Sequence, residues 1–184
     1  MKYLLLMCAG VFLESLVLTA VVSSKEDNLI APPTTVDKVD LQKYVGLWYE
    51  IAKIPNRFQK MCVSGTTAQY TLQEDGRIDV INTCIESNGK AKQAKGIARV
   101  VDSRTNAKLQ VSFVSFFGIR PFWGDYWIIG LGKDYEFAIV GAPDRKYGWI
   151  LSRSPVISAE MLNLSFVILR DKGYDPEDFV MTPQ

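Results

Sequence analysis

The chain has 184 residues, of which 48% are hydrophobic, enough for one domain with a substantial core and a removable leader. Its net charge is +1, from 21 Lys and Arg against 20 Asp and Glu, so nothing indicates the concentrated basic surface that nucleic-acid binding requires. The chain contains no histidine, which excludes Ser-His-Asp and Cys-His catalysis and removes the commonest transition-metal ligand.

Residues 1–24 have the pattern of a secretory signal peptide. Lys2 provides a basic start, residues 3–22 are mostly apolar, and small residues up to Ser24 precede a polar stretch. We therefore expect cleavage near Ser24 and a soluble exported protein, periplasmic or secreted. An uncleaved membrane anchor is the alternative, and it is disfavoured because Glu14 places a carboxylate inside the apolar run.

Residues 25–39 are predicted to form an extended lead-in to a single domain over residues 40–184. Pro32 and Pro33 disfavour both a helix and ladder hydrogen bonds there. Residues 40–43 are predicted to form a short polar turn before the first strand.

Eight segments with strand patterns follow, separated by turn signals at the spacing typical of a sandwich or a barrel. The predicted strands are 46–54, 63–72, 77–85, 92–101, 108–114, 125–131, 136–141 and 147–153. Two-faced strands joined by short turns fit an antiparallel meander. This pattern alone does not distinguish a barrel from a sandwich.

The periodicity changes after Pro155. Ser158 is a good N-cap residue, an apolar stripe with helical spacing follows, and Gly173 is suited to the position after a helix C-terminus. We expect a helix over 159–172 that packs its apolar side on the outside of the sheet structure.

Four motifs resemble those of the lipocalin family, and in particular its branch of bacterial lipocalins, plant temperature-induced lipocalins and apolipoprotein D. They are Gly46-Leu47-Trp48-Tyr49-Glu50-Ile51-Ala52, Ala68-Gln69-Tyr70-Thr71-Leu72, Asp75-Gly76-Arg77-Ile78 and Trp149-Ile150-Leu151-Ser152-Arg153-Ser154-Pro155. The resemblance decides for the barrel: an all-β, eight-stranded antiparallel up-and-down β-barrel with one C-terminal α-helix packed outside.

The resemblance also implies structural roles at one end of the barrel. Trp48 would plug the closed end, Arg153 would lie across its ring as a cation–π partner, and Gly46 would allow close backbone approach.

Alternation along the strands places a mainly apolar set of side chains inside the barrel, as expected of a small-molecule site. The predicted ligand-binding residues are Ala68, Tyr70, Leu72, Val80, Asn82, Ala98, Val111, Phe113 and Trp149. By the resemblance, Tyr70, Asn82 and Trp149 match cavity-lining positions of the apolipoprotein D-like branch. The Asn82 amide needs a hydrogen bond, which either a ligand or trapped water, or a neighbouring strand or tyrosine, would supply.

The connection over residues 113–124 is rich in aromatic side chains, which should not be exposed in an ordinary monomer. We expect the connection to cover the cup, to mediate a homodimer or to touch a membrane surface, where Arg120 would be available for phosphate. The alternative is that its rings pack on each other and on neighbouring loops. By the resemblance, this connection lies at the open end of the barrel.

Cys62 and Cys84 remain after leader removal, and an even pair in an exported chain favours a disulfide. A two-residue turn at Asp75-Gly76 would pair Thr67 with Cys84, so the bond requires a bulge or a bend in the second strand. Without the bond, Cys62 would be a free thiol near the cup mouth.

The leading hypothesis is a non-enzymatic carrier of a small hydrophobic or amphipathic ligand, such as a fatty acid or lysophospholipid, without a cofactor or metal. One alternative is a thiol-dependent isomerase of the lipocalin type with Cys62 as nucleophile. Another is an adhesion or dimer module that uses the aromatic connection.

Overall fold

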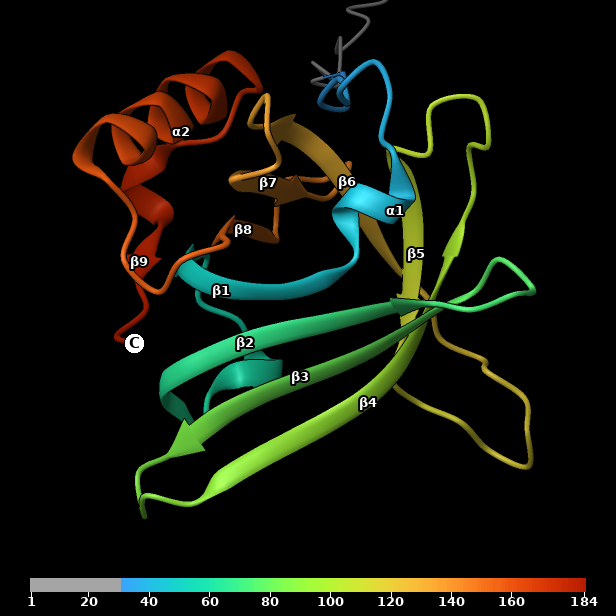
Figure 1. Ribbon diagram of the computed structural model, residues 1–184. Coiled ribbons are helices and arrows are strands. Elements are labelled where there is room, and N and C mark those ends of the chain that lie inside the picture. Colours follow the sequence, from blue (N-terminus) through green and yellow to red (C-terminus); the bar gives the residue numbers. More distant parts are fainter. Residues whose placement is uncertain (1–30) are drawn as a thin grey trace, which may run out of the picture. The chain divides into compact units, whose positions relative to one another are not determined.

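The computed structural model describes residues 31–184, and eight of its strands close into an antiparallel barrel (Figure 1). The strands are β1 (Gly46–Lys53), β2 (Cys62–Leu72), β3 (Ile78–Glu86), β4 (Ala91–Val100), β5 (Lys108–Ser112), β6 (Gly124–Leu131), β7 (Phe137–Gly141) and β8 (Gly148–Ser152). Each strand pairs with the next, and β1 closes the barrel by pairing with both β2 and β8. The predicted fold class is confirmed.

Helices and a ninth strand complete the domain. They are α1 (Leu41–Tyr44), η1 (Arg57–Gln59), α2 (Ala159–Asp171), η2 (Pro176–Asp178) and β9 (Val180–Met181). As predicted, α2 follows Ser158, whose hydroxyl accepts a hydrogen bond from the Met161 N–H, and its end is followed by Gly173 with a φ of 77°.

The apolar side chains form two separate cores because the strands have two faces. The inner core fills the closed half of the barrel, and its largest fully buried side chain is Trp48. The outer core lies between the barrel and α2, where Leu169 packs with Ile129, Ile139 and Ile150. Figure 1 shows α2 outside the barrel, where it contacts β6 and β7.

Several predicted boundaries were wrong. Most strand ends differ by one or two residues, β5 ends at Ser112 instead of residue 114, and α2 ends at Asp171. Residues 41–44 form α1 and not a turn, since the Asp40 carboxylate caps it by accepting from the Gln42 N–H.

The lead-in over residues 31–39 is extended but not free of backbone hydrogen bonds. The Val36 N–H donates to the Ile128 carbonyl, and the Val39 N–H donates to the Thr105 carbonyl. Val39 is fully buried in the inner core, so the end of the lead-in is part of the barrel.

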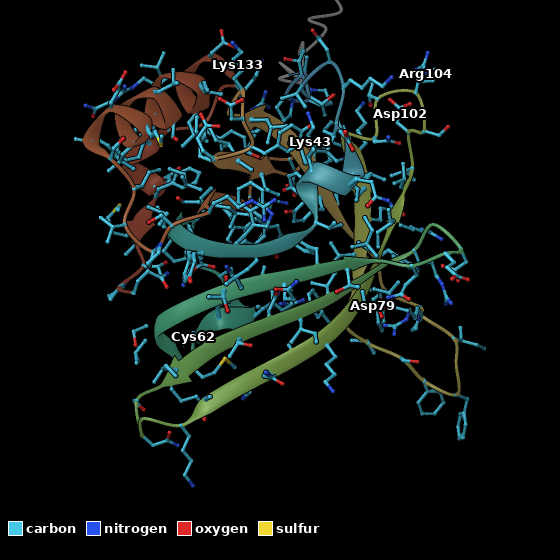
Figure 2. All side chains as sticks on the ribbon, in the orientation of Figure 1. Lys43, Cys62, Asp79, Asp102, Arg104 and Lys133 are labelled. Atoms are coloured by element: carbon cyan, nitrogen blue, oxygen red, sulfur yellow. A yellow bond between two sulfur atoms is a disulfide. The ribbon has the colours of Figure 1, made fainter. Side chains whose placement is uncertain are left out.

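The β2–β3 register differs by one residue from the prediction. The connection is a three-residue loop in which Gly76 has a φ of 80°, and Thr67 therefore pairs with Thr83. Two register shifts between Cys62 and Thr67 bring Cys62 to Cys84, with their Cα atoms 5.5 Å apart. The disulfide and the bulge that it requires are confirmed, and Figure 2 shows Cys62 at the start of β2.

Replacing both cysteines, as in C62A/C84A, should lower the free energy of unfolding by about 3 kcal/mol, because the bond closes a loop of 22 residues in the unfolded chain. Urea unfolding followed by tryptophan fluorescence measures this. Wild-type protein treated with reductant should shift to the same midpoint, and an unchanged midpoint would show that the bond does not restrict the unfolded chain.

None of the helices within residues 31–184 is both long and apolar enough to cross a bilayer. The predicted signal peptide lies outside the described residues.

Candidate ligand-binding site

The closed end of the barrel is sealed by Trp48 and Arg153. The Arg153 guanidinium carbon lies 3.8 Å from the centroid of the Trp48 ring, and the Trp48 indole N–H donates to the Tyr44 carbonyl at 2.8 Å. Arg153 also donates to the backbone carbonyls of residues 43, 44, 45 and 47. Gly46 has a φ of 101°, and a Cβ atom there would lie 3.3 Å from an Arg153 nitrogen. The expected stacking and the close approach at Gly46 are therefore present.

Three tyrosine hydroxyls meet within the barrel above this plug. The Tyr126 hydroxyl lies 2.7 Å from that of Tyr44 and 3.0 Å from that of Tyr70. Burial raises the pKa of Tyr70 to about 12 and raises the pKa values of Tyr44 and Tyr126 well above the usual range. Tyr44 and Tyr126 were not among the predicted ligand-binding residues: Tyr44 lies between the predicted turn over 40–43 and the first predicted strand, and Tyr126 was placed in a predicted strand without an inward assignment.

The tyrosine cluster should make the fold sensitive to alkaline pH. A tyrosine whose pKa is higher in the folded state stabilises the fold fully below its unfolded pKa of about 10, and this stabilisation is lost as pH rises through the folded pKa. The free energy of unfolding should therefore fall between about pH 10 and 12. This loss of unfolding free energy should be smaller in Y126F than in the wild type. An equal loss in Y126F and wild type would show that groups other than the tyrosine cluster cause it.

The inner wall changes from buried to solvent-accessible along one row of paired residues. Ala68 pairs with Asn82, and Asn82 pairs with Ala94, so the three side chains share the inward face of β2, β3 and β4. Ala68 is buried in the inner core, Asn82 is half-buried and Ala94 is exposed. The inward face is therefore buried at the Trp48 end and exposed to solvent toward the other end.

Two buried oxygen atoms on this wall have no hydrogen-bond partner within residues 31–184: Oδ1 of Asn82 and Oγ1 of Thr66. Leaving a buried polar group unpaired costs about 1–3 kcal/mol. Within residues 31–184, neither a neighbouring strand nor a tyrosine donates a hydrogen bond to Oδ1 of Asn82. The side-chain positions therefore do not support that alternative for this atom.

A bulge in β1 adds a polar cluster to the inner wall. The pairing of β1 with β8 shifts between Glu50 and Ala52, so that Glu50 faces Leu151 and Lys53 faces Trp149, both on the inward side. The buried Glu50 carboxylate accepts from Lys53 Nζ at 2.7 Å and from Gln59 Nε2 at 2.6 Å. The Trp149 indole N–H donates to Gln59 Oε1 at 3.2 Å, which ties η1 to the mouth.

The C-terminal tail fills the gap where β1 and β2 separate. The two strands pair only from Gly46 to Tyr49 on the β1 side, and beyond this point β9 pairs with β1. The Thr182 hydroxyl donates to Glu50 Oε1 at 2.7 Å, and the Gly65 N–H donates to the Pro183 carbonyl at 2.8 Å. The sequence patterns did not indicate either the tail or the polar cluster.

The predicted ligand-binding residues occupy different depths of the barrel. Ala68, Tyr70, Val80 and Ala98 are buried in the inner core, and Leu72, Val111 and Trp149 pack against it. Leu72 is near the closed end and also lines a shallow outer hollow beside α1. Phe113 lies beyond the end of β5 and is 40% exposed, with its ring over Gly96.

The aromatic connection between β5 and β6 lies at the open end, together with the β1–β2, β3–β4 and β7–β8 connections. Its rings do not pack under neighbouring loops: Phe117 is 91% exposed and Phe116 is 68% exposed. Trp123 differs from them, because the Arg99 guanidinium covers its ring at 4.0 Å.

The disulfide removes the thiolate that the isomerase alternative requires, because Cys62 and Cys84 are the only cysteines in residues 31–184. In the same part of the chain, no group of three or more Cys, Asp or Glu side chains is arranged to hold a metal ion.

A closed eight-stranded barrel that is plugged at one end is an architecture able to hold one small ligand. The family model described as "Lipocalin-like domain" matches residues 39–184. The chain therefore belongs to the lipocalin family, as the motifs predicted.

Relatives in three kingdoms agree with the predicted branch. The chain is 39% identical to the outer membrane lipoprotein Blc of Escherichia coli, over 82% of each chain. It is 40% identical to temperature-induced lipocalin-1 of Arabidopsis thaliana over 81% of each, and 35% identical to mouse apolipoprotein D over 83% of this chain and 80% of that one. Among solved structures, insecticyanin of Manduca sexta has the same fold, with a TM-score of 0.67 at 24% identity and 84% coverage of each chain.

Proposed function

We propose that this chain binds and carries a small hydrophobic or amphipathic molecule, such as a fatty acid or lysophospholipid, in the open cup. The observation that carries the proposal is the unpaired Oδ1 of Asn82, buried in an inner wall that is otherwise mostly apolar. Such an atom gains most from a ligand that brings a hydrogen-bond donor into the cup, as the free glycerol hydroxyl of a lysophospholipid does. The carboxylate of a fatty acid only accepts hydrogen bonds, so it would bond to the amide N–H₂ group of Asn82 and not to this oxygen. Membership of the lipocalin family supports a binding role and not a catalytic one.

The cup has different chemistry at its two depths, which favours an amphipathic ligand. The inner core offers apolar contacts near Tyr70 and Val80, whereas Asn82, Lys53 and the Trp149 indole lie toward the mouth. A ligand would place its hydrocarbon part inward and its polar group beside Asn82. We further propose that the chain is exported before it takes up this ligand.

Displacement of a fluorescent fatty acid from the purified protein tests the proposal. Fatty acids and lysophospholipids should displace the probe with micromolar or lower dissociation constants, on the order of −8 kcal/mol of binding free energy. Failure of every lipid, sterol and pigment tried to bind would contradict a carrier function.

Replacing Asn82 with leucine should separate binding from stability. N82L should keep or raise the free energy of unfolding, because it removes an unpaired buried amide, and it should weaken binding of a lipid with a polar group about tenfold. Q93L is the matched control, since Gln93 is exposed on the outward face of β4. An affinity that changes equally in N82L and Q93L would remove Asn82 from the site.

A further inference from the structure

The tip of the β5–β6 connection is a small hairpin of exposed apolar side chains. Backbone hydrogen bonds of 2.9 Å in both directions join Phe116 and Ile119, and the rings of Phe116 and Phe117 meet edge to face. Ile119 and Phe122 are each 69% exposed. Figure 1 shows the backbone of the connection extending away from the barrel.

The backbone holds the tip in an unfavourable conformation for its sequence. Phe117 and Gly118 have φ values of 47° and 79°, which are the positive angles of a type I′ turn. Asn and Gly suit such positions, whereas a bulky side chain with positive φ is uncommon and strained. An aromatic ring at this position therefore stabilises neither the turn nor a core.

Two contacts, one on each side of the hairpin, hold its base against the barrel and so fix the position of the tip. Arg120 Nη1 donates to the Ser112 carbonyl at 3.0 Å. On the other side, Trp123 is held by the Arg99 guanidinium.

The open end is basic, in contrast to the other end of the barrel. Its four connections carry a net charge of +5, from the cations Arg57, Lys60, Lys90, Arg120, Arg145 and Lys146 and the single acid Asp144. The three strand connections at the closed end carry a net charge of −2, from five acids and three bases. More apolar surface lies on the basic end, because Phe58 is 59% exposed and Met61 is 37% exposed there.

We propose that the open end docks on the surface of an anionic lipid bilayer, with the Phe116–Ile119 tip inserted among the headgroups. Exposed aromatic rings surrounded by cations suit a surface that is apolar inside and negative outside. A second copy of this chain fits less well, because the cations on the two sets of open-end connections would repel each other. Docking in this orientation would point the cup mouth at the lipid surface, and it does not depend on which ligand the cup holds.

Tryptophan reporters test the insertion directly in the full chain. F117W places a new indole at the tip, and L164W places one on the exposed side of α2, where Leu164 is 47% exposed. Each variant is mixed with vesicles of phosphatidylcholine, with or without phosphatidylglycerol, that contain brominated acyl chains. The tryptophan introduced by F117W should be quenched by the anionic vesicles, whereas that introduced by L164W should not.

F117N provides a second readout, because Asn suits the positive φ and removes the ring. It should unfold at the same or a higher urea concentration and bind anionic vesicles about tenfold more weakly than wild type. All variants share one N-terminus, so differences between them report on the tip. Equal quenching of F117W and L164W, or equal vesicle binding by F117N and wild type, would overturn the proposal. So would a dimer that F117N dissociates without any quenching of F117W.

Discussion

Replacing Trp48 with alanine should lower the free energy of unfolding by about 3–5 kcal/mol, the loss typical of a large aromatic side chain removed from a packed core. Trp48 is completely buried and belongs to the inner core. The substitution also exposes the Arg153 guanidinium, which loses the ring beneath it, and frees the Tyr44 carbonyl from the indole N–H. Urea unfolding monitored by circular dichroism measures the loss.

W48F is the matched control for this plug. It keeps most of the buried ring but loses the N–H donor, and the Tyr44 carbonyl still accepts from Arg153 at 3.0 Å. We therefore expect W48F to cost about 1–2 kcal/mol, clearly less than W48A. Equal stabilities of W48A and wild type would mean that the closed end does not depend on its indole.

Removing Lys53 should also lower the free energy of unfolding strongly, although Lys53 is not part of an apolar core. K53M leaves the Glu50 carboxylate buried without its cationic partner, and breaking one side of a buried ion pair typically costs about 3–5 kcal/mol. Gln59 and Thr182 still donate to the carboxylate, so the lower part of this range is expected.

A second variant separates the uncompensated charge from lost packing. In K53M/E50Q the amide is neutral, so most of the stability lost in K53M should return. R77M is the control for an exposed pair: Arg77 Nη2 lies 2.6 Å from Asp75 Oδ2, but the two side chains are 60% and 49% exposed, so R77M should lower the free energy of unfolding far less than K53M does. If K53M and R77M lower the free energy of unfolding by the same amount, Glu50 and Lys53 do not behave as a buried ion pair.

The sequence predicted the elements whose pattern is local. Alternation identified the eight strands, Ser158 and Gly173 marked α2, and the motif around Trp48 led to its contact with Arg153. Asp40 was also a readable N-cap signal for α1, and it was missed because the four-residue helix was assigned as a turn.

The parts of the site that were missed depend on contacts that no local pattern contains. Strict alternation after Trp48 and Glu50 would turn Ala52 inward and Lys53 outward. The bulge at Ile51 reverses this, because pairing with β8 shifts by one residue there. The tail contacts of Thr182 with Glu50 span 132 residues, so only the folded barrel brings them together.

Photochemical labelling tests the location of the ligand most directly. A fatty acid with a photoactivatable group in its chain would be bound to the protein, irradiated, and its attachment sites mapped by peptide mass spectrometry. We predict attachment to the inward wall around Val80–Cys84 and near Trp149, abolished by excess unlabelled fatty acid. Attachment confined to the outer face of α2, or to the shallow hollow lined by Leu41, Gln42 and Leu72, would contradict a ligand site inside the cup.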